Sequence, residues 1–285
     1  MSADRNISAT SGVVAGTGAR DAGDAAMQVR SVSKHYGGLE VLSDVDVTID
    51  RGAFYGIVGP NGAGKTTLLN VISGVVKCDR GEVWVDDVDL TRLGPDRRVL
   101  HGVARTFQTV RLVPGRTVLD QVVFGAYDRM GGHTWRHLTG QRAAIRQMAE
   151  IRGDAEHLLE QLGMGGKLDA VAEMLPYGDQ RRVEVARALM ARPKVLLLDE
   201  PAAGMGPKEW MPLVEYLLDL TRNGLTVVLI EHNMKLVESA CERVVVLDFG
   251  KVLAEGPPRE CLRTKEVREA YFGTGKVSYG RRVVG

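Results

Sequence analysis

The residues best suited to chemistry form a glycine-rich run that ends in lysine and threonine. Its members are Gly59, Pro60, Asn61, Gly62, Ala63, Gly64, Lys65 and Thr66. The apolar stretch 55–58 before it predicts a buried strand, and residues 67–73 after it predict a helix that ends at Gly74. Glycines let successive backbone N–H groups point inward, and the following helix presents its positive end to an anion. This pattern predicts a phosphate-binding P-loop.

The spacing of this motif is specific. A chance match in a chain of this length has a probability of about 1 in 100 from average residue usage. The alternative, a glycine-rich turn beside an exposed lysine, does not explain the flanking strand and helix. In a P-loop, Lys65 neutralises the terminal phosphates of a nucleoside triphosphate, and the Thr66 hydroxyl holds Mg²⁺.

Two carboxylates end a second apolar strand, 195–198, and form a Walker B arrangement if that strand lies beside the P-loop. Asp199 would orient Mg²⁺ directly or through water, and Glu200 would accept a proton from the attacking water. The alternative is an acidic turn before Pro201, which the P-loop makes less attractive.

Two further polar residues, Gln108 and His232, complete the candidate set. Gln108 comes after Phe107, where its amide could contact Mg²⁺ or the water at a subdomain hinge. His232 comes after the strand that ends near Ile230, where its imidazole could bond the γ-phosphate and align Glu200. Taken singly, Gln108 could be a solvated loop residue and His232 a neighbour of a helix N-cap. Their order after a P-loop favours the catalytic interpretation.

The elements that must position these residues fall into three groups. Alternating apolar residues at 28–32, 44–50 and 83–85 predict half-exposed antiparallel strands. Continuous apolar runs at 194–198, 225–230 and 243–247, separated by helical patterns, predict a parallel sheet covered on both faces. Between about 118 and 174 the pattern is helical and no strand-like alternation appears, which predicts an inserted subdomain at about 111–180. We therefore predict an α/β P-loop core with a parallel central sheet, an N-terminal antiparallel β subdomain and an inserted helical subdomain, joined by loops at 111–116 and 175–179.

Composition limits the rest of the interpretation. The chain has 285 residues, a formal net charge of +1 and three well-separated cysteines. The balanced charge gives no reason to expect nucleic acid as a partner, and the cysteine spacing predicts neither a zinc site nor a disulfide framework. Residues 1–26 are small and polar and predict a disordered extension; the ordered domain spans 27–273 and a tail 274–285. No apolar stretch approaches the roughly 20 residues needed to cross a bilayer.

The combined motifs resemble those of ABC-type ATPases over most of 27–273. Besides the residues above, the segment 175–189 (LPYGDQRRVEVARAL) occupies the signature position. That segment, the run DEPAAGM from Asp199 and the ending VLDFGKVLAEGPPRE are most similar to the longer ATP-binding subunit of branched-chain amino-acid importers. The usual signature Leu-Ser-Gly-Gly-Gln reads Leu-Pro-Tyr-Gly-Asp here, and the usual Asp in the loop after Glu200 is missing.

The resemblance implies a cytoplasmic ATPase, peripheral on the inner face of the cell membrane. Two ATP-binding subunits, identical or related, would enclose two Mg-ATP molecules and act on two transmembrane permease subunits, which receive solute from a periplasmic or extracellular binding protein. Gly178 and the start of the helix near Asp179 would meet the partner subunit's nucleotide, with the charge of Asp179 partly offsetting the helix's positive end. Tyr36 would stack on adenine, unless it packs on its own sheet. Thr67 would bond the α-phosphate, unless it is a plain residue of a helix N-terminus.

Other functions are less consistent with the sequence. An exporter ATPase, for example for lipopolysaccharide extraction, normally keeps Ser-Gly-Gly in the signature. Non-transport ABC proteins carry tandem cores or a long coiled coil, neither of which is visible in this sequence. A nucleotide-binding module without catalysis is expected to lack the acid at Glu200. Trp135, with Arg142 and Arg146, could receive a permease helix or form a subdomain core with solvated arginines.

Overall fold

The computed structural model describes residues 25–127 and 141–272. Its centre is a six-stranded sheet in the order β10-β9-β3-β8-β7-β6. All neighbouring pairs are parallel except the antiparallel pair β10 and β9. These strands are β3 (Phe54–Val58), β6 (Val103–Arg105), β7 (Val195–Asp199), β8 (Thr226–Ile230), β9 (Arg243–Asp248) and β10 (Lys251–Gly256).

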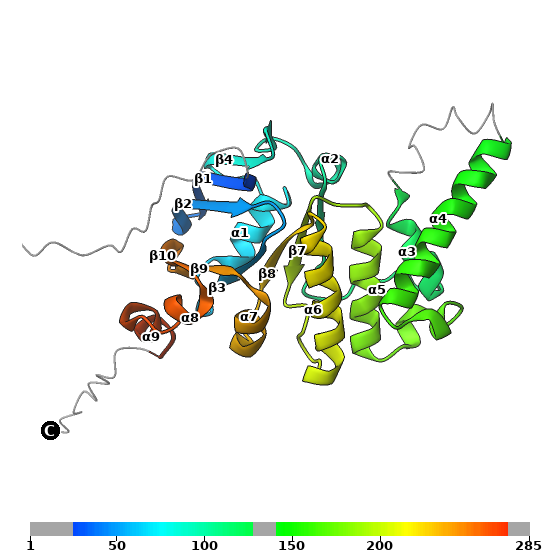
Figure 1. Ribbon diagram of the computed structural model, residues 1–285. Helices are drawn as coiled ribbons and strands as arrows, with labels where there is room; N and C mark the ends of the chain where they lie inside the picture. Colours follow the sequence, from blue (N-terminus) through cyan, green and yellow to red (C-terminus); the bar gives the residue numbers. More distant parts are fainter. Residues whose placement is uncertain (1–24, 128–140, 273–285) are drawn as a thin grey trace, which may run out of the picture.

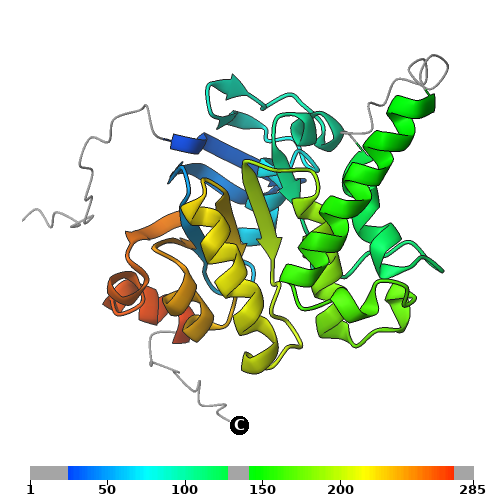
Figure 2. The same ribbon diagram turned by 45° about the vertical axis from the view of Figure 1, so that its right-hand side comes forward.

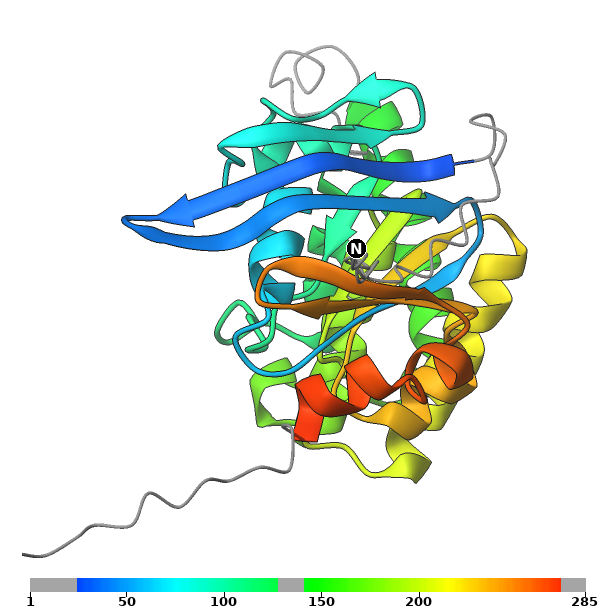
Figure 3. The ribbon, with the colours of Figure 1, turned by 90° about the vertical axis from the view of Figure 1, so that its left-hand side faces the viewer.

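A second, antiparallel sheet in the order β2-β1-β4-β5 lies over one face of the central sheet (Figures 1 and 3). Its strands are β1 (Ala25–Tyr36), β2 (Leu39–Asp50), β4 (Arg80–Val85) and β5 (Val88–Asp89). Ala25 and Ala26, which lie within the predicted extension, belong to β1, because Ala25 pairs with Asp50 and the side chain of Ala26 is buried. The predicted antiparallel subdomain is therefore present, with longer strands than the alternation indicated.

The described helices are α1 (Lys65–Ile72), α2 (Pro95–Leu100), α3 (Val118–Phe124), α4 (Gln141–Gln161), α5 (Tyr177–Leu189), α6 (Pro207–Arg222), α7 (Met234–Ala240), α8 (Pro258–Cys261) and α9 (Lys265–Phe272), with short 3-10 turns at Gly165–Lys167 and Ala172–Met174. Helix α1 packs in the core that the central sheet shares with the antiparallel sheet. Helices α6 and α7 cover the other face, and α3, α4 and α5 continue from them into a helical region (Figure 2). Within the described ranges, no helix combines the length and apolar character that crossing a bilayer requires.

The two apolar cores follow the alternation of side chains along the central strands. On β8, Val228 and Ile230 point to the core shared with α1 and the antiparallel sheet, whereas Val227 and Leu229 point to the core shared with α6 and α7. This second core also contains residues of α3 and α4, such as Val118 and Ala155. The helical insertion therefore packs on the catalytic core without an interruption in the buried apolar surface.

The loop predicted at 175–179 is partly wrong, because α5 already begins at Tyr177 with Pro176 as its N-cap. Proline is well suited to a helix start, where its missing N–H has no intrahelical partner. The predicted domain limits remain predictions, and α5 spans the limit placed near residue 180. The predicted extension 1–26, except its last two residues, and the predicted tail 274–285 lie outside the described residues, as does Trp135.

Candidate active site

The P-loop follows β3 and leads into α1, as the sequence predicts. Gly59 leaves the strand with a φ of +150°, and a Cβ there would lie 2.2 Å from the carbonyl oxygen of Leu247 on β9. Only glycine lets the chain pass so close to the neighbouring strand. The first turn of α1 then begins at Lys65, and Leu68 N–H donates to the carbonyl of Gly64 at 2.9 Å.

Lys65 is buried within this loop. Its Nζ donates to the carbonyls of Gly59 and Pro60, at 2.8 and 2.9 Å. Burial lowers the pKa of the Lys65 ammonium below its usual value, and the negative charges of Glu200 and Asp199 oppose that shift. Lys65 thus stabilises the loop through two hydrogen bonds to its backbone, and the carboxylates of Glu200 and Asp199 are near enough to favour its charged form.

A cleft of about 280 Å³ brings the P-loop together with residues from three distant segments. It is lined by Val41, Asn61, Gly62, Ala63, Gly64, Lys65, Thr66, Thr67, Gln108, Glu200 and His232. Gly59, Pro60, Tyr36, Asp199 and Gly178 do not line it. The sequence thus identified ten of its eleven lining residues and missed Val41.

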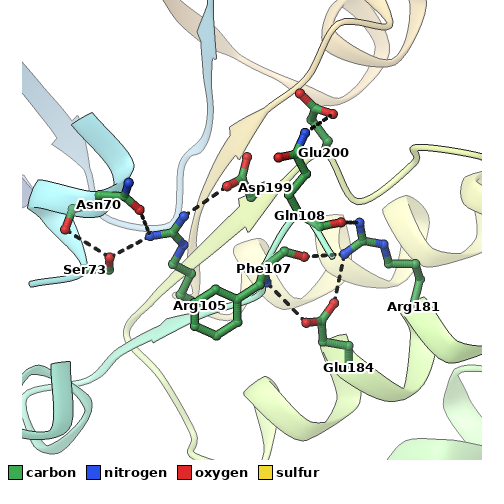
Figure 4. Close-up of polar contacts among 9 residues, drawn as sticks. All are labelled: Asn70, Ser73, Arg105, Phe107, Gln108, Arg181, Glu184, Asp199 and Glu200. Atoms are coloured by element: carbon green, nitrogen blue, oxygen red, sulfur yellow. Dashed lines mark hydrogen bonds and ion pairs between the residues drawn. The ribbon is translucent and has the colours of Figure 1, made fainter. Parts of the chain in front are cut away.

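Glu200 stands at the centre of the polar contacts in this cleft. Its Oε1 lies 2.8 Å from Nε2 of His232. Its Oε2 accepts from Nε2 of Gln108 at 3.2 Å, a contact drawn in Figure 4. An ionised carboxylate can only accept, so the first contact requires that His232 carry its proton on Nε2. Glu200 also has a left-handed backbone with φ +49°, which turns it away from β7. Strain of this kind in a non-glycine residue is typical of functional positions.

Asp199 occupies the last position of β7 and is almost fully buried. Its Oδ2 accepts from Nη2 of Arg105 at 3.0 Å, and Nη1 of Arg105 donates to Asn70 Oδ1 and Ser73 Oγ, at 2.6 and 2.9 Å (Figure 4). Burial lowers the pKa of the Arg105 guanidinium, and the charge of Asp199 counteracts this. Arg105 therefore ties the acid to the helix that follows the P-loop, a contact that sequence reasoning missed.

The oxygen donors predicted for Mg²⁺ fit that ion in kind. Thr66 and Gln108 both line the cleft, and they would supply a hydroxyl and an amide oxygen, with Asp199 adding a carboxylate at the end of β7. Mg²⁺ favours hard oxygen ligands and takes one or two carboxylates together with substrate phosphates. Among the described residues, no group of three or more His, Cys, Asp or Glu side chains is placed to hold a metal.

Two predicted residues lie apart from the cleft. Tyr36 ends β1 with 48% of its surface exposed, and Lys34 Nζ lies 5.5 Å from its ring centroid, so its stacking on adenine remains a prediction. Gly178 sits in the first turn of α5 beside Met205 and Glu209. Its contact with a partner subunit's nucleotide also remains a prediction.

Glu231 is a further residue that the sequence did not single out. Its carboxylate is buried and accepts from three backbone N–H groups, those of Ala202, His232 and Asn233, at 3.0, 3.0 and 3.2 Å. It therefore links the loop after Glu200 to the backbone of His232. An acid directly after a buried strand was the available signal, but its partner Ala202 lies 29 positions away in the sequence.

Comparisons with known proteins agree with this geometry. Residues 42–203 match the ABC transporter family. The chain is 34% identical over 248 residues to the high-affinity branched-chain amino acid transport ATP-binding protein BraF of Pseudomonas aeruginosa, covering 87% of this chain and 97% of BraF. It is 31% identical over 247 residues to the lipopolysaccharide export system ATP-binding protein LptB of Haemophilus influenzae, covering 87% and 97%.

Solved structures give the same result. A nucleotide-free ATP-binding cassette from an ABC transporter superposes with a TM-score of 0.77 at 30% identity, covering 88% of this chain and all of that one. A dimeric bacterial ABC transporter cassette superposes with a TM-score of 0.70 at 28% identity, covering 82% and 99%. The resemblance predicted from the motifs is confirmed, and the chain belongs to the ABC transporter family of ATP-hydrolysing subunits.

Proposed function

We propose that this chain is the ATP-hydrolysing subunit of an importer for branched-chain or related amino acids. The observation that carries the catalytic part is the placement of Glu200 between Gln108 and His232 in the cleft that the P-loop lines. The similarity to BraF supports the importer, as do Pro176 and Tyr177, which replace the serine and glycine expected of an exporter signature.

The chain's own residues have separate tasks in this mechanism. The P-loop backbone and Lys65 bind the phosphates of ATP, while Thr66, Gln108 and Asp199 would hold Mg²⁺, which neutralises charge on the phosphates. Glu200 accepts the proton of the attacking water, and His232 fixes the orientation of Glu200 through Nε2. Gln108 holds the other oxygen of Glu200, so the acceptor is restrained on both sides.

The assembly follows from the family. Two such subunits, identical or paired with a related chain, would enclose two ATP molecules, each between one P-loop and the other subunit's α5. ATP would favour the closed pair because it contacts both halves only there. Two permease subunits would hold the pair at the inner face of the membrane, and a solute-binding protein would deliver the amino acid. The dimeric cassette among the structural neighbours supports this arrangement.

Replacing Glu200 by Gln tests the catalytic part. The change removes the proton acceptor and one negative charge, so we expect ATP to bind and turnover to fall by at least about 100-fold, the lower end of the range for general-base catalysis. Size-exclusion chromatography with ATP should then show a stable dimer. Glu215→Gln on the exposed side of α6 is the matched control. Turnover unchanged from wild type would refute the assignment.

The transported solute needs a separate experiment. The chain is co-purified with its membrane partners and reconstituted in proteoliposomes, and ATP turnover is measured with added amino acids and their binding protein. Stimulation by leucine, isoleucine or valine would support the importer. Stimulation by lipopolysaccharide instead would favour the exporter, to which the similarity with LptB also points.

A further inference from the structure

A buried ion pair on α5 grips the backbone that carries Gln108. Arg181 donates through Nη1 to the carbonyl of Phe107 and through Nη2 to the carbonyl of Gln108 (Figure 4). Glu184, one turn along the helix, accepts from the N–H of Phe107 at 3.2 Å and pairs with Arg181 at 2.9 Å. We call Arg181 and Glu184 the α5 clamp.

The clamp binds the backbone directly after the point where the central sheet ends. Strand β6 stops at Arg105, and Thr106 N–H makes the last ladder bond, to Leu197 at 2.9 Å. Beyond that point, two carbonyls and one N–H of Phe107 and Gln108 are bound by the clamp. A planar guanidinium can reach two successive carbonyls at once, which a lysine ammonium cannot do with the same geometry.

Stability alone does not account for such a pair. The side chains of Arg181 and Glu184 are only 1% and 2% exposed. Burying two charges costs desolvation, and apolar residues of similar volume often stabilise a fold equally well. What the charges add is a defined position for the backbone at 107–108.

That position matters because of what Gln108 touches. The Gln108 side chain is exposed, yet its Nε2 donates to the proposed proton acceptor Glu200 at 3.2 Å. We propose that Arg181 and Glu184 are positioning residues for ATP hydrolysis, which hold Gln108 against Glu200 and join the orientation of α5 to the hydrolytic site. The proposal rests on the proposed function.

The clamp also defines a short route between two active sites of a dimer. Helix α5 begins at Tyr177 and Gly178, the segment predicted to meet the partner subunit's nucleotide. Arg181 lies one turn further along the same rigid helix. A shift of α5 when the partner's ATP binds would therefore move Gln108 through a single layer of side chains.

A double-mutant cycle tests the clamp. The variant Arg181→Met with Glu184→Met removes both charges of the clamp together, so neither member is left as an unpaired buried ion and the variant should fold. The half-buried Arg187 loses the nearby charge of Glu184 in this variant. We expect turnover to fall about 10- to 100-fold, as for a misplaced catalytic group, while the ATP dissociation constant changes less than 3-fold. In a Gln108→Ala background, the same pair of changes should lower turnover by less than about 2-fold, because the clamp acts through Gln108.

Controls separate positioning from folding. Arg182→Met removes a neighbouring charge of α5 whose guanidinium reaches Asp179 and the carbonyl of Glu209, so it should not reproduce the non-additivity. Arg181→Lys keeps the charge but not the planar guanidinium, so it should recover less than half of the turnover that the Arg181→Met and Glu184→Met variant loses. Hydrogen exchange gives a readout independent of activity: the Phe107 amide should exchange at least about 10-fold faster in the clamp variant.

The possible results are distinguishable. The clamp would be overturned if the Arg181→Met and Glu184→Met pair lowered turnover by the same factor in the Gln108→Ala background as in wild type. Unchanged hydrogen exchange at the Phe107 amide would also overturn it. Wild-type turnover in Gln108→Ala alone would overturn the catalytic role of Gln108 in the proposed function. Faster exchange in the clamp variant would then still support the anchoring of the backbone.

Discussion

The contact between Arg105 and Asp199 allows a quantitative prediction for the substitution Arg105→Met. The two side chains are 8% and 3% exposed, so neither charge can be satisfied by bulk water once the other is removed. Deleting one partner of a buried ion pair typically costs about 3–5 kcal/mol, because the remaining charge is left uncompensated. The hydrogen bonds of Arg105 to Asn70 and Ser73 are lost as well.

We therefore expect the free energy of unfolding to fall by about 4 kcal/mol, within the 3–5 kcal/mol range for broken buried pairs. For a domain of this size, the same change corresponds to a decrease in melting temperature of roughly 8–16 °C. Equilibrium denaturation in urea without nucleotide measures the free energy directly. Arg222→Met, whose ion pair with Asp219 is largely exposed, should stay within about 0.5 kcal/mol of wild type.

The double variant Arg105→Met with Asp199→Asn separates the ion pair from simple packing. Because neither member of the pair then carries a charge, it should be about 2 kcal/mol or more closer to wild type than the sum of the two single changes. A cost below about 1 kcal/mol for Arg105→Met, or full additivity in the double variant, would show that the pair is not the buried, mutually dependent contact described above.

Three further predictions concern the P-loop and the packing. Lys65→Ala should weaken ATP binding about 10- to 100-fold, from the 1.5–3 kcal/mol of a hydrogen bond to a charged group, and normal affinity in an equilibrium titration would contradict the P-loop assignment. Gly125→Ala should destabilise the fold by about 1–3 kcal/mol in urea, because its Cβ would lie 1.9 Å from the carbonyl oxygen of Arg187. The control Gly153→Ala on α4 meets open space and should be neutral or stabilising. Equal effects of the two substitutions would be evidence against the close approach of α3 and α5. Burial raises the pKa of Cys241 to about 12, so the folded state favours the protonated thiol. The contribution of this preference to the free energy of unfolding is complete below about pH 8.5 and is lost as the pH rises towards 12. Between pH 8 and pH 10, wild type should therefore lose about 1–2 kcal/mol relative to Cys241→Ala, and a constant difference would argue against the shift.

Local sequence predicted the elements whose signals are local. Strands β7, β8 and β9 are covered on both faces, so their apolar runs are continuous, and the P-loop motif specifies both its own turn and the helix after it. Strand β6 was not predicted. It has three residues, too few to show a period, and its position depends on pairing with β7.

The contacts that position the catalytic side chains could not be predicted in the same way. Arg105 meets Asp199 across 94 positions, and Arg181 meets Gln108 across 73. Each partner taken alone is an ordinary charged residue, and only the adjacency of β6, β7 and α5 makes it specific. The sequence thus proposed the groups for the reaction, whereas the residues that hold these groups in place became apparent only in the folded chain.

The altered signature at the start of α5 is another place where contacts of the folded chain change an expectation from the sequence. The sequence suggested that Asp179 would offset the positive end of the helix. In the structure its carboxylate accepts from Lys167 Nζ at 2.5 Å and from Arg182 Nη1 at 3.4 Å. With the Glu209 carboxylate beside Gly178 included, two positive and two negative charges leave this end of α5 without a net charge. Asp179 therefore does not cancel the field of the first turn, since its charge is already compensated by neighbours. Replacing the signature serine by Pro176 removes a hydroxyl without making the helix N-terminus repel an anion.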